Sequence, residues 1–328
     1  MCKKVFQIIL TLLYLNAKSQ TFEVDQIEQI FRPRLKVDSK YIFDSKFKDT
    51  SGVFNQKEAN AVFTFPIKTK FNADIGLDLK NLRLKEVLKN SIRVKASQTL
   101  GLIRVNTRAV NIGFDTLPQK NIYNATAGLL GMRLTKKYRV MFYSLNASIA
   151  EQDKTIYNPV LRATALIGQL HLRGFKKNFF YGIAAVYSDG LFIPAPFFGG
   201  SEPLGKKFIL NYTLPVQINL QYKNDKRTII TAGLSADGYR TGINYLTKRL
   251  NLNYTSAVAY ASIRFKFSRT FVGRIEGGYV FYQNLRYTKT DNYRTNFNIS
   301  PGAYVQVGFN VLFGKTLWEK ILDGLVNN

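Results

Sequence analysis

His171 is the residue most suited by type to catalysis, because it is the only histidine of the 328-residue chain. It lies between Leu170 and Leu172, with no cysteine or second histidine at the spacing of a metal site. A serine hydrolase also needs a nucleophile and a residue that orients the histidine, and neither is recognisable here. We therefore interpret His171 as a wall residue, and we predict no enzyme activity, no cofactor and no metal ion.

A second set of polar residues lies near the C-terminus and could line a channel. Arg274 and Glu276 alternate with apolar residues such as Ile275, and the same spacing continues to Asn284 and Arg286. Charged groups that face lipid cost several kcal/mol, so we expect this face to point into a lumen. It would form either a structural ladder of salt bridges or a solute-binding site. The same argument assigns four further residues to the lumen: Gln217, Asn219, Gln306 and Asn310.

The segment 191–206 is rich in proline and glycine and contains the pair Gly199–Gly200. Neither the spacing of a Walker loop nor that of a dinucleotide-binding loop is present, so a phosphate site is not indicated. An apolar link of this length is expected to fold over the mouth of a barrel or into its lumen.

The charge of the chain implies an anionic partner. Its 47 basic and 21 acidic residues give a formal net charge of +26. Lipopolysaccharide or acidic lipid headgroups, anionic solutes and nucleic acid are the candidates. The export signal described next makes nucleic acid the weakest candidate, and no nucleic-acid-binding motif is found.

The first 19 residues have the three parts of a secretory signal peptide. A basic start (1–4) precedes an apolar core (5–15) and a small-x-small cleavage site at Ala17–Ser19. Cys2, the only cysteine, lies before this core, where lipid attachment is not expected. The mature chain would therefore begin at Gln20 without any thiol. We divide the remainder into a lead-in (20–33), a barrel (34–314) and an amphipathic tail (315–328).

Alternation of apolar and polar residues dominates the mature chain and predicts amphipathic β-strands. From Phe208 to Tyr222 every even position is apolar, and from Phe297 to Phe313 most odd positions are. Beyond the signal peptide there is no apolar run of the ~20 residues that a membrane helix needs. Such long amphipathic strands suit a closed barrel that crosses a bilayer, because closure pairs every backbone group. A soluble β-sandwich is the alternative.

We predict an all-β, antiparallel, up-and-down transmembrane barrel of about 14 strands, with 12 as the alternative count. Short polar turns near 136–137, 175–178, 224–227 and 268–270 are assigned to the periplasmic side, and longer links near 151–157, 191–206, 238–249 and 289–295 to the other side. The predicted strands are 34–49, 58–70, 73–84, 91–105, 107–115, 122–135, 138–150, 158–173, 179–189, 207–222, 228–239, 250–267, 271–287 and 296–313.

The tail 315–328 forms one apolar side of a predicted short helix, made of Leu317, Trp318, Ile321, Leu322, Leu325 and Val326. Many barrels end with their last strand, so this segment is an addition. It could lie on the inner leaflet with Trp318 as an interfacial anchor, dock under the barrel or bind a periplasmic partner.

The mature chain resembles an uncharacterised outer-membrane β-barrel family of Bacteroidota. The resemblance rests on Ser19–Gln20, the segment Tyr212–Val216, Tyr222 at a hairpin end and the strand Arg274–Tyr279. It implies fold and location but brings no functional residues. The membrane component of the type IX secretion system is a second similar family, but its early Asn-Pro-rich segment is not found after Gln20.

These observations predict a protein of the cell outer membrane that is exported across the inner membrane and inserted by the barrel-assembly machinery. Its partners would be outer-membrane lipid and lipopolysaccharide. A pore or transporter for small, anionic solutes is the first functional hypothesis. A structural or docking barrel without an open pore, such as a secretion-system accessory, is the alternative.

Overall fold

The computed structural model describes residues 32–75, 92–113, 119–135, 139–152, 160–172, 177–188, 191–225, 227–245, 248–268, 270–288 and 294–313. The predicted signal peptide, most of the lead-in and the tail with Trp318 lie outside these residues. Among the described residues, no helix is long and apolar enough to cross a membrane. The strands are β1 (Arg34–Lys46), β2 (Val53–Ile75), β3 (Ile92–Ile112), β4 (Gln119–Thr135), β5 (Arg139–Gln152), β6 (Val160–Leu172), β7 (Asn178–Ser188), β8 (Leu191–Pro203), β9 (Phe208–Leu214), β10 (Gln217–Lys223), β11 (Thr228–Tyr245), β12 (Lys248–Lys266), β13 (Phe271–Thr288), β14 (Arg294–Ile299) and β15 (Gly302–Leu312).

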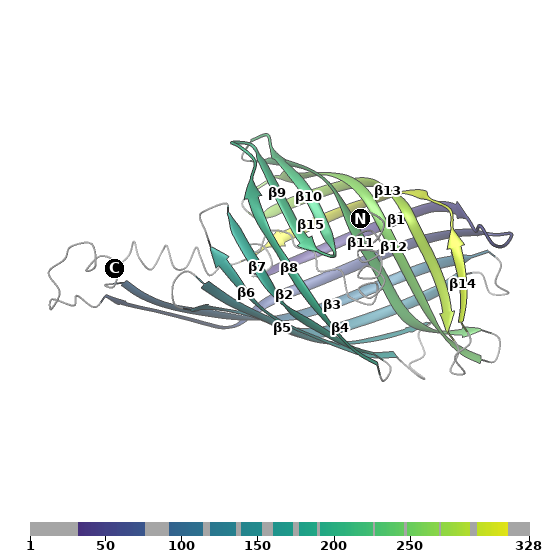
Figure 1. The fold of residues 1–328 in the computed structure, drawn as a ribbon, viewed down its shortest axis with the longest axis horizontal. Helices are drawn as coiled ribbons and strands as arrows, with labels where there is room; N and C mark the ends of the chain where they lie inside the picture. The colour runs from purple at the N-terminus through teal and green to yellow at the C-terminus, as the bar shows by residue number, and fades with distance from the viewer. Residues whose placement is uncertain are drawn as a thin grey trace, which may run out of the picture.

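The strands form one closed antiparallel barrel (Figure 1). Each strand from β1 to β13 pairs with the next, and β15 pairs with both β13 and β1 to close the ring. β14 and β15 pair with successive parts of β13 and are separated only by Ser300 and Pro301, so together they occupy the place of one interrupted strand. Counted in this way, the barrel has 14 strands, which confirms the predicted fold class and the larger of the two predicted strand counts.

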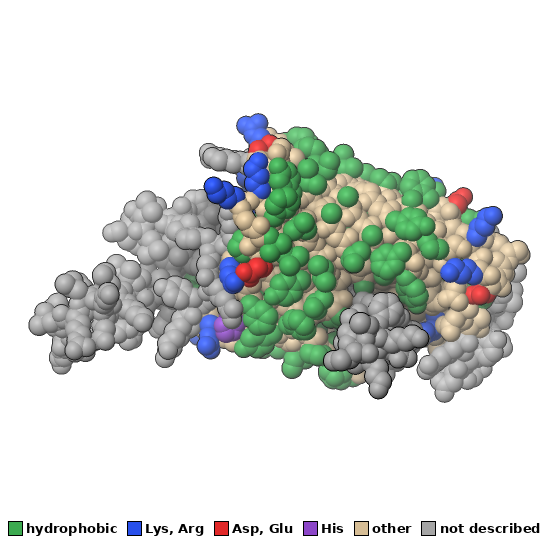
Figure 2. Space-filling view, turned by 45° about the horizontal axis from the view of Figure 1, so that its top comes forward, with side chains coloured by type: hydrophobic (Ala, Val, Ile, Leu, Met, Phe, Trp, Pro, Cys, Tyr) green, Lys and Arg blue, Asp and Glu red, His purple; other side chains and the backbone are tan. Residues whose placement is uncertain are grey.

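The apolar and polar residues that alternate in the sequence lie on the outer and inner faces of the barrel wall, respectively. In β1, Leu35 and Val37 are exposed on the outer surface, whereas Arg34 and Lys36 are buried in the lumen. Apolar side chains cover the middle of the wall, and the visible charged groups gather toward its two ends (Figure 2). A soluble barrel would bury these apolar side chains, so the outer face is suited to lipid.

Two of the observed strands are longer than predicted. β2 spans the predicted strand 58–70 and the beginning of 73–84, and β3 spans 91–105 and most of 107–115. The predicted break between residues 70 and 73 is absent: β2 continues through it, and its ladder with β3 skips Ile67 in a bulge next to Pro66. Bulges absorb an extra residue without ending a strand.

The predicted strand 207–222 is in fact the hairpin β9–β10. Pro215 lacks an N–H group and cannot continue a ladder, and Val216 donates a hydrogen bond to the carbonyl of Thr213 at 2.7 Å to close the turn. Thr213 pairs with Gln217, four positions later. Since four is an even number, the apolar–polar pattern keeps its phase through the turn, which hides the turn in the sequence.

The predicted Pro/Gly-rich link 191–206 is also different, because most of it forms β8. It pairs along β7 from Leu191 to Ser201 but with β9 only from Phe198 to Pro203. The expectation of a loop over the mouth or in the lumen was therefore wrong. Proline is tolerated in a strand where no partner requires its N–H group, and Pro194 and Pro196 lie where β8 has no pairing with β9.

We call the end of the barrel where β1 begins the proximal end and the opposite end the distal end. The described strand ends next to the predicted short turns lie at the proximal end. Between β10 and β11, the Asp225 carboxylate accepts hydrogen bonds from the N–H groups of Arg227 and Thr228, both at 2.6 Å, which lowers its pKa. Long distal links at 191–206 and 238–249 are absent, because these residues belong mainly to β8, β11 and β12.

The distal half of the wall is uneven. β9 and β10 have seven residues each, and their neighbours β8 and β11 continue beyond the hairpin tip (Figure 1). Further along, Gly242 of β11 forms a parallel bridge with Glu151 of β5. This bridge connects strands that are six positions apart in the ring, so the distal end is narrower than the part that includes β6–β10.

Candidate functional site

A polar cavity of about 150 Å³ lies inside the barrel, and we call it the chamber. Its walls come from opposite sides of the ring, with β1–β6 on one side and β10–β13 and β15 on the other. The charged residues that line it are Asp38, Lys40, Glu58, Arg104, Arg108, Arg162, Asp237, Arg240, Arg274 and Glu276. Six of them are basic and four are acidic, so the lining carries a net positive charge.

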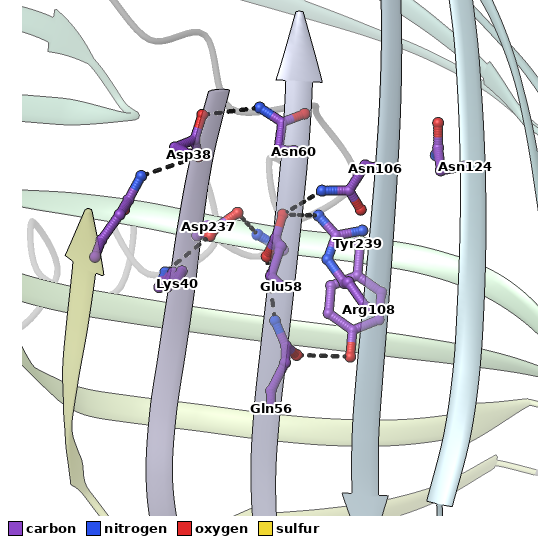
Figure 3. Close-up of polar contacts among 12 residues, drawn as sticks. Asp38, Lys40, Gln56, Glu58, Asn60, Asn106, Arg108, Asn124, Asp237 and Tyr239 are labelled. Carbon is purple, nitrogen blue, oxygen red and sulfur yellow. Dashed lines mark hydrogen bonds and ion pairs between the residues drawn. The ribbon is translucent and has the colours of Figure 1, made fainter. Parts of the chain in front are cut away.

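Glu58 is the centre of the network shown in Figure 3. Its carboxylate accepts hydrogen bonds from Arg108 at 2.8 Å and from Asn106 at 2.5 Å, both on β3, and from Gln56 at 3.3 Å. The Tyr239 hydroxyl of β11 donates to the side-chain oxygen of Gln56 at 2.9 Å, and the Arg108 guanidinium lies 4.4 Å from the Tyr239 ring centre. The network thus connects β2 and β3 to β11 across the lumen.

A second set of contacts across the lumen starts from β1. Lys40 forms an ion pair with Asp237 of β11 at 3.3 Å, and its ammonium lies 4.7 Å from the centre of the Tyr304 ring. Two residues away, Asp38 pairs with Lys36 at 3.5 Å and accepts hydrogen bonds from Asn60 and Gln306, both at 3.1 Å. These charges are held in the lumen by several partners each, as buried charges require.

The structure brings four of the predicted lumen residues to the chamber. Arg274 forms an ion pair with Glu276, which also accepts a hydrogen bond from the Tyr304 hydroxyl at 2.8 Å. Gln217 donates to the Tyr260 hydroxyl at 2.5 Å, and Gln306 contacts Asp38. Asn219 and Asn310 are buried on inner faces but do not line the chamber.

Asn284 and Arg286 lie on the other face of β13. Along the β12 ladder, Val258 pairs with Val280 but the next residue, Ala257, pairs with Tyr282, so Phe281 is bulged out. The bulge shifts the alternation by one, and Gln283 and Leu285 become the buried residues. The hydrogen bonds of Asn284 with Asn298 and of Arg286 with Asn296 are exposed. This outward placement differs from the sequence expectation of one face running from Arg274 to Arg286.

An apolar cluster fills the lumen on the distal side of the chamber, and we call it the distal plug. The Phe54 ring of β2 stacks on Tyr254 of β12 with ring centres 5.4 Å apart, and Tyr254 stacks on Tyr239 at 5.3 Å. Tyr239 and Tyr254 are paired neighbours on adjacent strands, whereas the Phe54–Tyr254 contact reaches from β2 to β12 across the lumen. The distal plug comprises Ile42, Phe47, Phe54, Val110, Ile112, Ile122, Tyr239, Ile243, Leu250, Leu252, Tyr254, Val258, Tyr260, Val280, Leu285, Tyr287, Ile299 and Tyr304.

A second apolar cluster lines the inner wall from β3 to β8 on the proximal side, and we call it the proximal cluster. Its aromatic members Phe142, Phe180 and Phe197 have ring centres 6.2–6.3 Å apart. The full set is Ala96, Leu100, Leu130, Met132, Val140, Phe142, Leu170, Phe180 and Phe197, with Leu102, Leu134, Leu166 and Ala184 packed against it. The chamber is thus a polar space between two apolar ones.

Gly278 makes room for one chamber contact, because a Cβ atom there would lie 2.5 Å from the Tyr304 ring and 2.5 Å from the carbonyl oxygen of Ala259. We expect Gly278→Ala to displace Tyr304 from Glu276 and to lower the free energy of unfolding by about 1–3 kcal/mol. Urea unfolding of the folded barrel in lipid vesicles measures this. Gly277→Ala is the matched control, since its Cβ would meet open space. Equal losses in both variants would contradict the assigned packing.

The charged chamber residues that sequence analysis did not single out are Asp38, Lys40, Glu58, Arg104, Arg108, Arg162, Asp237 and Arg240. The sequence does carry a signal for these residues, because each occupies a polar position of an alternating strand. What the sequence does not show is which strands meet across the lumen. His171 lies outside the chamber and stacks on Tyr181 with ring centres 5.6 Å apart. The residues described here contain no group of three His, Cys, Asp or Glu side chains that could hold a metal ion.

Several solved outer-membrane proteins are similar in fold. The deltaS2 mutant of the TodX monoaromatic hydrocarbon channel of P. putida aligns over 86% of this chain and 90% of its own, with 8% identity and a TM-score of 0.45. An outer membrane channel from Pseudomonas putida F1 aligns over 90% and 100%, with 9% identity and a TM-score of 0.38. The transport unit of the autotransporter AIDA-I from Escherichia coli aligns over 93% and 97%, with 9% identity and a TM-score of 0.40.

None of the curated proteins compared with the chain matches it. A family model does match, from residue 16 to residue 314, and this range contains every strand of the barrel. On the strength of that match the chain belongs to the family described as "Domain of unknown function (DUF6268)".

Proposed function

We propose that this protein is a selective outer-membrane channel that rests closed and accepts a small anionic group in its chamber. The single observation that carries the proposal is the position of a net positive, ion-paired chamber between the distal plug and the proximal cluster. A general diffusion pore has a water-filled polar lumen. Here the axis is filled by contacts such as Phe54–Tyr254, so passage requires side chains to move.

The proposed location follows from the outer surface. Leu161, Ile167 and Ile183 are 64%, 55% and 58% exposed on the wall formed by β6 and β7. Apolar side chains at this exposure are stable against lipid, and a closed ring leaves no backbone edge in the bilayer. Together with the predicted signal peptide (1–19), this supports export to the outer membrane, insertion by the barrel-assembly machinery and contact with lipid and lipopolysaccharide.

Planar-bilayer recording tests the channel proposal. We expect purified wild-type protein to show little steady conductance, and the double variant Phe54→Ala/Tyr254→Ala to conduct, because it removes two rings that block the axis. The matched control is Phe63→Ala/Phe65→Ala, which removes a stacked pair from the outer side of β2 with ring centres 5.5 Å apart. The control variant should remain closed.

A structural or docking barrel is the second candidate, and the ion pairs across the lumen favour it. Lys40–Asp237 and the network from Glu58 to Tyr239 join opposite walls and would stiffen a barrel that transports nothing. If the folded plug variant stayed silent in the bilayer, the channel proposal would fail and this second candidate would stand.

A further inference from the structure

The wall of the barrel has an opening at its side, which we call the notch. β8 pairs with β9 only as far as Phe198, and β10 pairs with β11 only as far as Ser235. Beyond these residues, no described strand pairs with the edge of β8 from Phe192 to Phe197 or with the edge of β11 from Asp237 to Thr241, until β11 meets β5 at Gly242. The hairpin tip 214–217 forms the floor of the notch.

The sequence keeps the notch free of strands. A row of unpaired N–H and C=O groups normally attracts a further strand. Pro194 and Pro196 occupy alternate positions of the β8 edge, and neither can donate a backbone hydrogen bond. All of β8 through this region remains paired with β7, so its missing donors lie on the notch side. A docked peptide strand is therefore disfavoured, and an opening for a smaller molecule is favoured.

The chamber extends to the notch. Its lining includes Val216 and Gln217 at the hairpin tip and the consecutive residues from Ser235 to Arg240 along the β11 edge. Because adjacent residues of a strand point to opposite faces, a run of six can line one cavity only where the strand edge borders it. The chamber therefore borders the notch along the hairpin tip and the β11 edge.

The outer surface around the notch is apolar. Phe192 and Phe198 of β8 are 62% and 48% exposed, and Leu234 of β11 is 52% exposed. Behind β8, Ile183 and Tyr187 of β7 continue the apolar surface. The notch thus opens within the lipid-facing belt, and a molecule that enters through it comes from the membrane.

The inner side of the notch combines cationic and apolar surfaces. The Nε and Nη2 atoms of Arg162 on β6 are buried and have no hydrogen-bond partner among the described residues. Arg162 lines the chamber, where six basic side chains outnumber four acidic ones, so the local charge is positive. Toward the proximal end the same inner wall becomes apolar, with Leu166 of β6, Ala184 of β7 and Phe197 of β8. An acidic head and an apolar chain would each meet a matching surface.

We propose that the notch is a lateral portal through which an anionic amphiphile, a molecule with a carboxylate or phosphate head and an apolar chain, passes between the membrane and the chamber. The head binds the guanidinium of Arg162, and the chain lies along the inner wall of β6–β8. This inference rests on the proposed channel function and names the ligand class and route of the same chamber. Planar guanidinium groups form bidentate, charge-assisted hydrogen bonds with such heads.

Equilibrium binding to the full barrel in neutral detergent tests the ligand class. Laurate and dodecyl phosphate are the probes, with inorganic phosphate and a second neutral detergent as comparisons. We expect Arg162→Gln to weaken binding of both acidic probes about tenfold or more, the size of one charged hydrogen bond. Arg139→Gln makes the same charge change at an exposed proximal residue outside the chamber and should leave binding unchanged.

Three binding results would overturn the inference. Binding of inorganic phosphate as tightly as dodecyl phosphate would show that the apolar chain of the probe is not recognised. Competition by the second neutral detergent as strong as that by the acidic probes would show that the acidic head is not recognised. Unchanged binding in Arg162→Gln would show that Arg162 does not bind the acidic head. A difference between laurate and dodecyl phosphate would show which acidic head the chamber takes.

The route is tested separately by transfer of the acidic probes from vesicles into reconstituted protein. Pro194→Trp places a large ring at the β8 edge of the notch, outside the chamber lining, and should slow transfer at least severalfold while leaving the equilibrium affinity in detergent similar. Unchanged transfer would mean entry along the axis and would overturn the portal. Absence of binding by a barrel whose Phe54→Ala/Tyr254→Ala variant conducts would overturn this inference but leave the channel proposal in place.

Discussion

Glu58→Leu is expected to destabilise the barrel by about 3–5 kcal/mol, because it leaves Arg108 in the lumen without its countercharge. The side chains of both residues are only 15% exposed, and their charged atoms lie 2.8 Å apart. The same substitution removes the acceptor of Asn106 and Gln56. Unfolding in urea from lipid vesicles, followed by far-ultraviolet circular dichroism, gives the change in free energy.

A double-mutant cycle separates the ion pair from general packing. Glu58→Leu/Arg108→Met removes both charges and keeps an apolar stem beside Tyr239, so we expect it to be more stable than Glu58→Leu alone. Glu58→Gln, which keeps a hydrogen-bonding side chain, should fall between wild type and Glu58→Leu. If the double variant lost the sum of the two single losses, Glu58 and Arg108 would not be coupled.

Ile167→Lys is expected to cost about 2–4 kcal/mol or to prevent insertion, because it places a charge on the lipid-facing side of β6. Ile167 is 55% exposed and is flanked across the ladder by Tyr143 and Ile183. The fraction of refolded protein that resists heat-induced change of migration in gel electrophoresis reports insertion, and urea unfolding reports stability.

Asn284→Lys is the matched control for Ile167→Lys. Asn284 also points outward, but beyond the β13 bulge its neighbours on that face are polar and exposed. We therefore expect a change within about 0.5 kcal/mol, as for other polar surface positions. A large loss in Asn284→Lys together with none in Ile167→Lys would place the lipid belt elsewhere on the wall.

The fold class could be predicted from the sequence because period-two alternation reports an inside and an outside for each strand. The count of 14 was confirmed although four assignments differed: two pairs of predicted strands merge into β2 and β3, one link is β8 and one strand is the hairpin β9–β10. The unbroken alternation of apolar and polar residues explains why the hairpin β9–β10 was predicted as one strand. Thr213 and Gln217 share a face across the turn, so no break appears in the pattern.

The chamber was only partly predictable. Arg274 and Glu276 stand out because two charges interrupt an apolar strand near the C-terminus. The inward or outward direction of Asn284 and Arg286 depends on one bulged residue, Phe281, and a one-residue shift reverses every later side chain. The pairing of Lys40 with Asp237 joins residues 197 positions apart. Such contacts depend on ring closure and on the tilt of the strands, which local sequence patterns do not specify.

The chamber also changes the meaning of the basic excess. Several basic side chains are paired with acidic ones in the lumen, as in Lys40–Asp237 and Arg108–Glu58. The proposed anion preference therefore rests on the surplus of six basic over four acidic groups in the chamber rather than on the net charge of the chain. In a cavity walled by low-dielectric protein, a small surplus acts on a passing ion more strongly than many charges in water.

The reversal potential of the Phe54→Ala/Tyr254→Ala variant in a planar bilayer under a salt gradient tests whether this protein is a closed, anion-accepting channel. We expect an open channel whose reversal potential has the sign of anion selectivity, while the wild type and the Phe63→Ala/Phe65→Ala control pass little current. A folded plug variant that carries no current, or one that prefers cations, would contradict it.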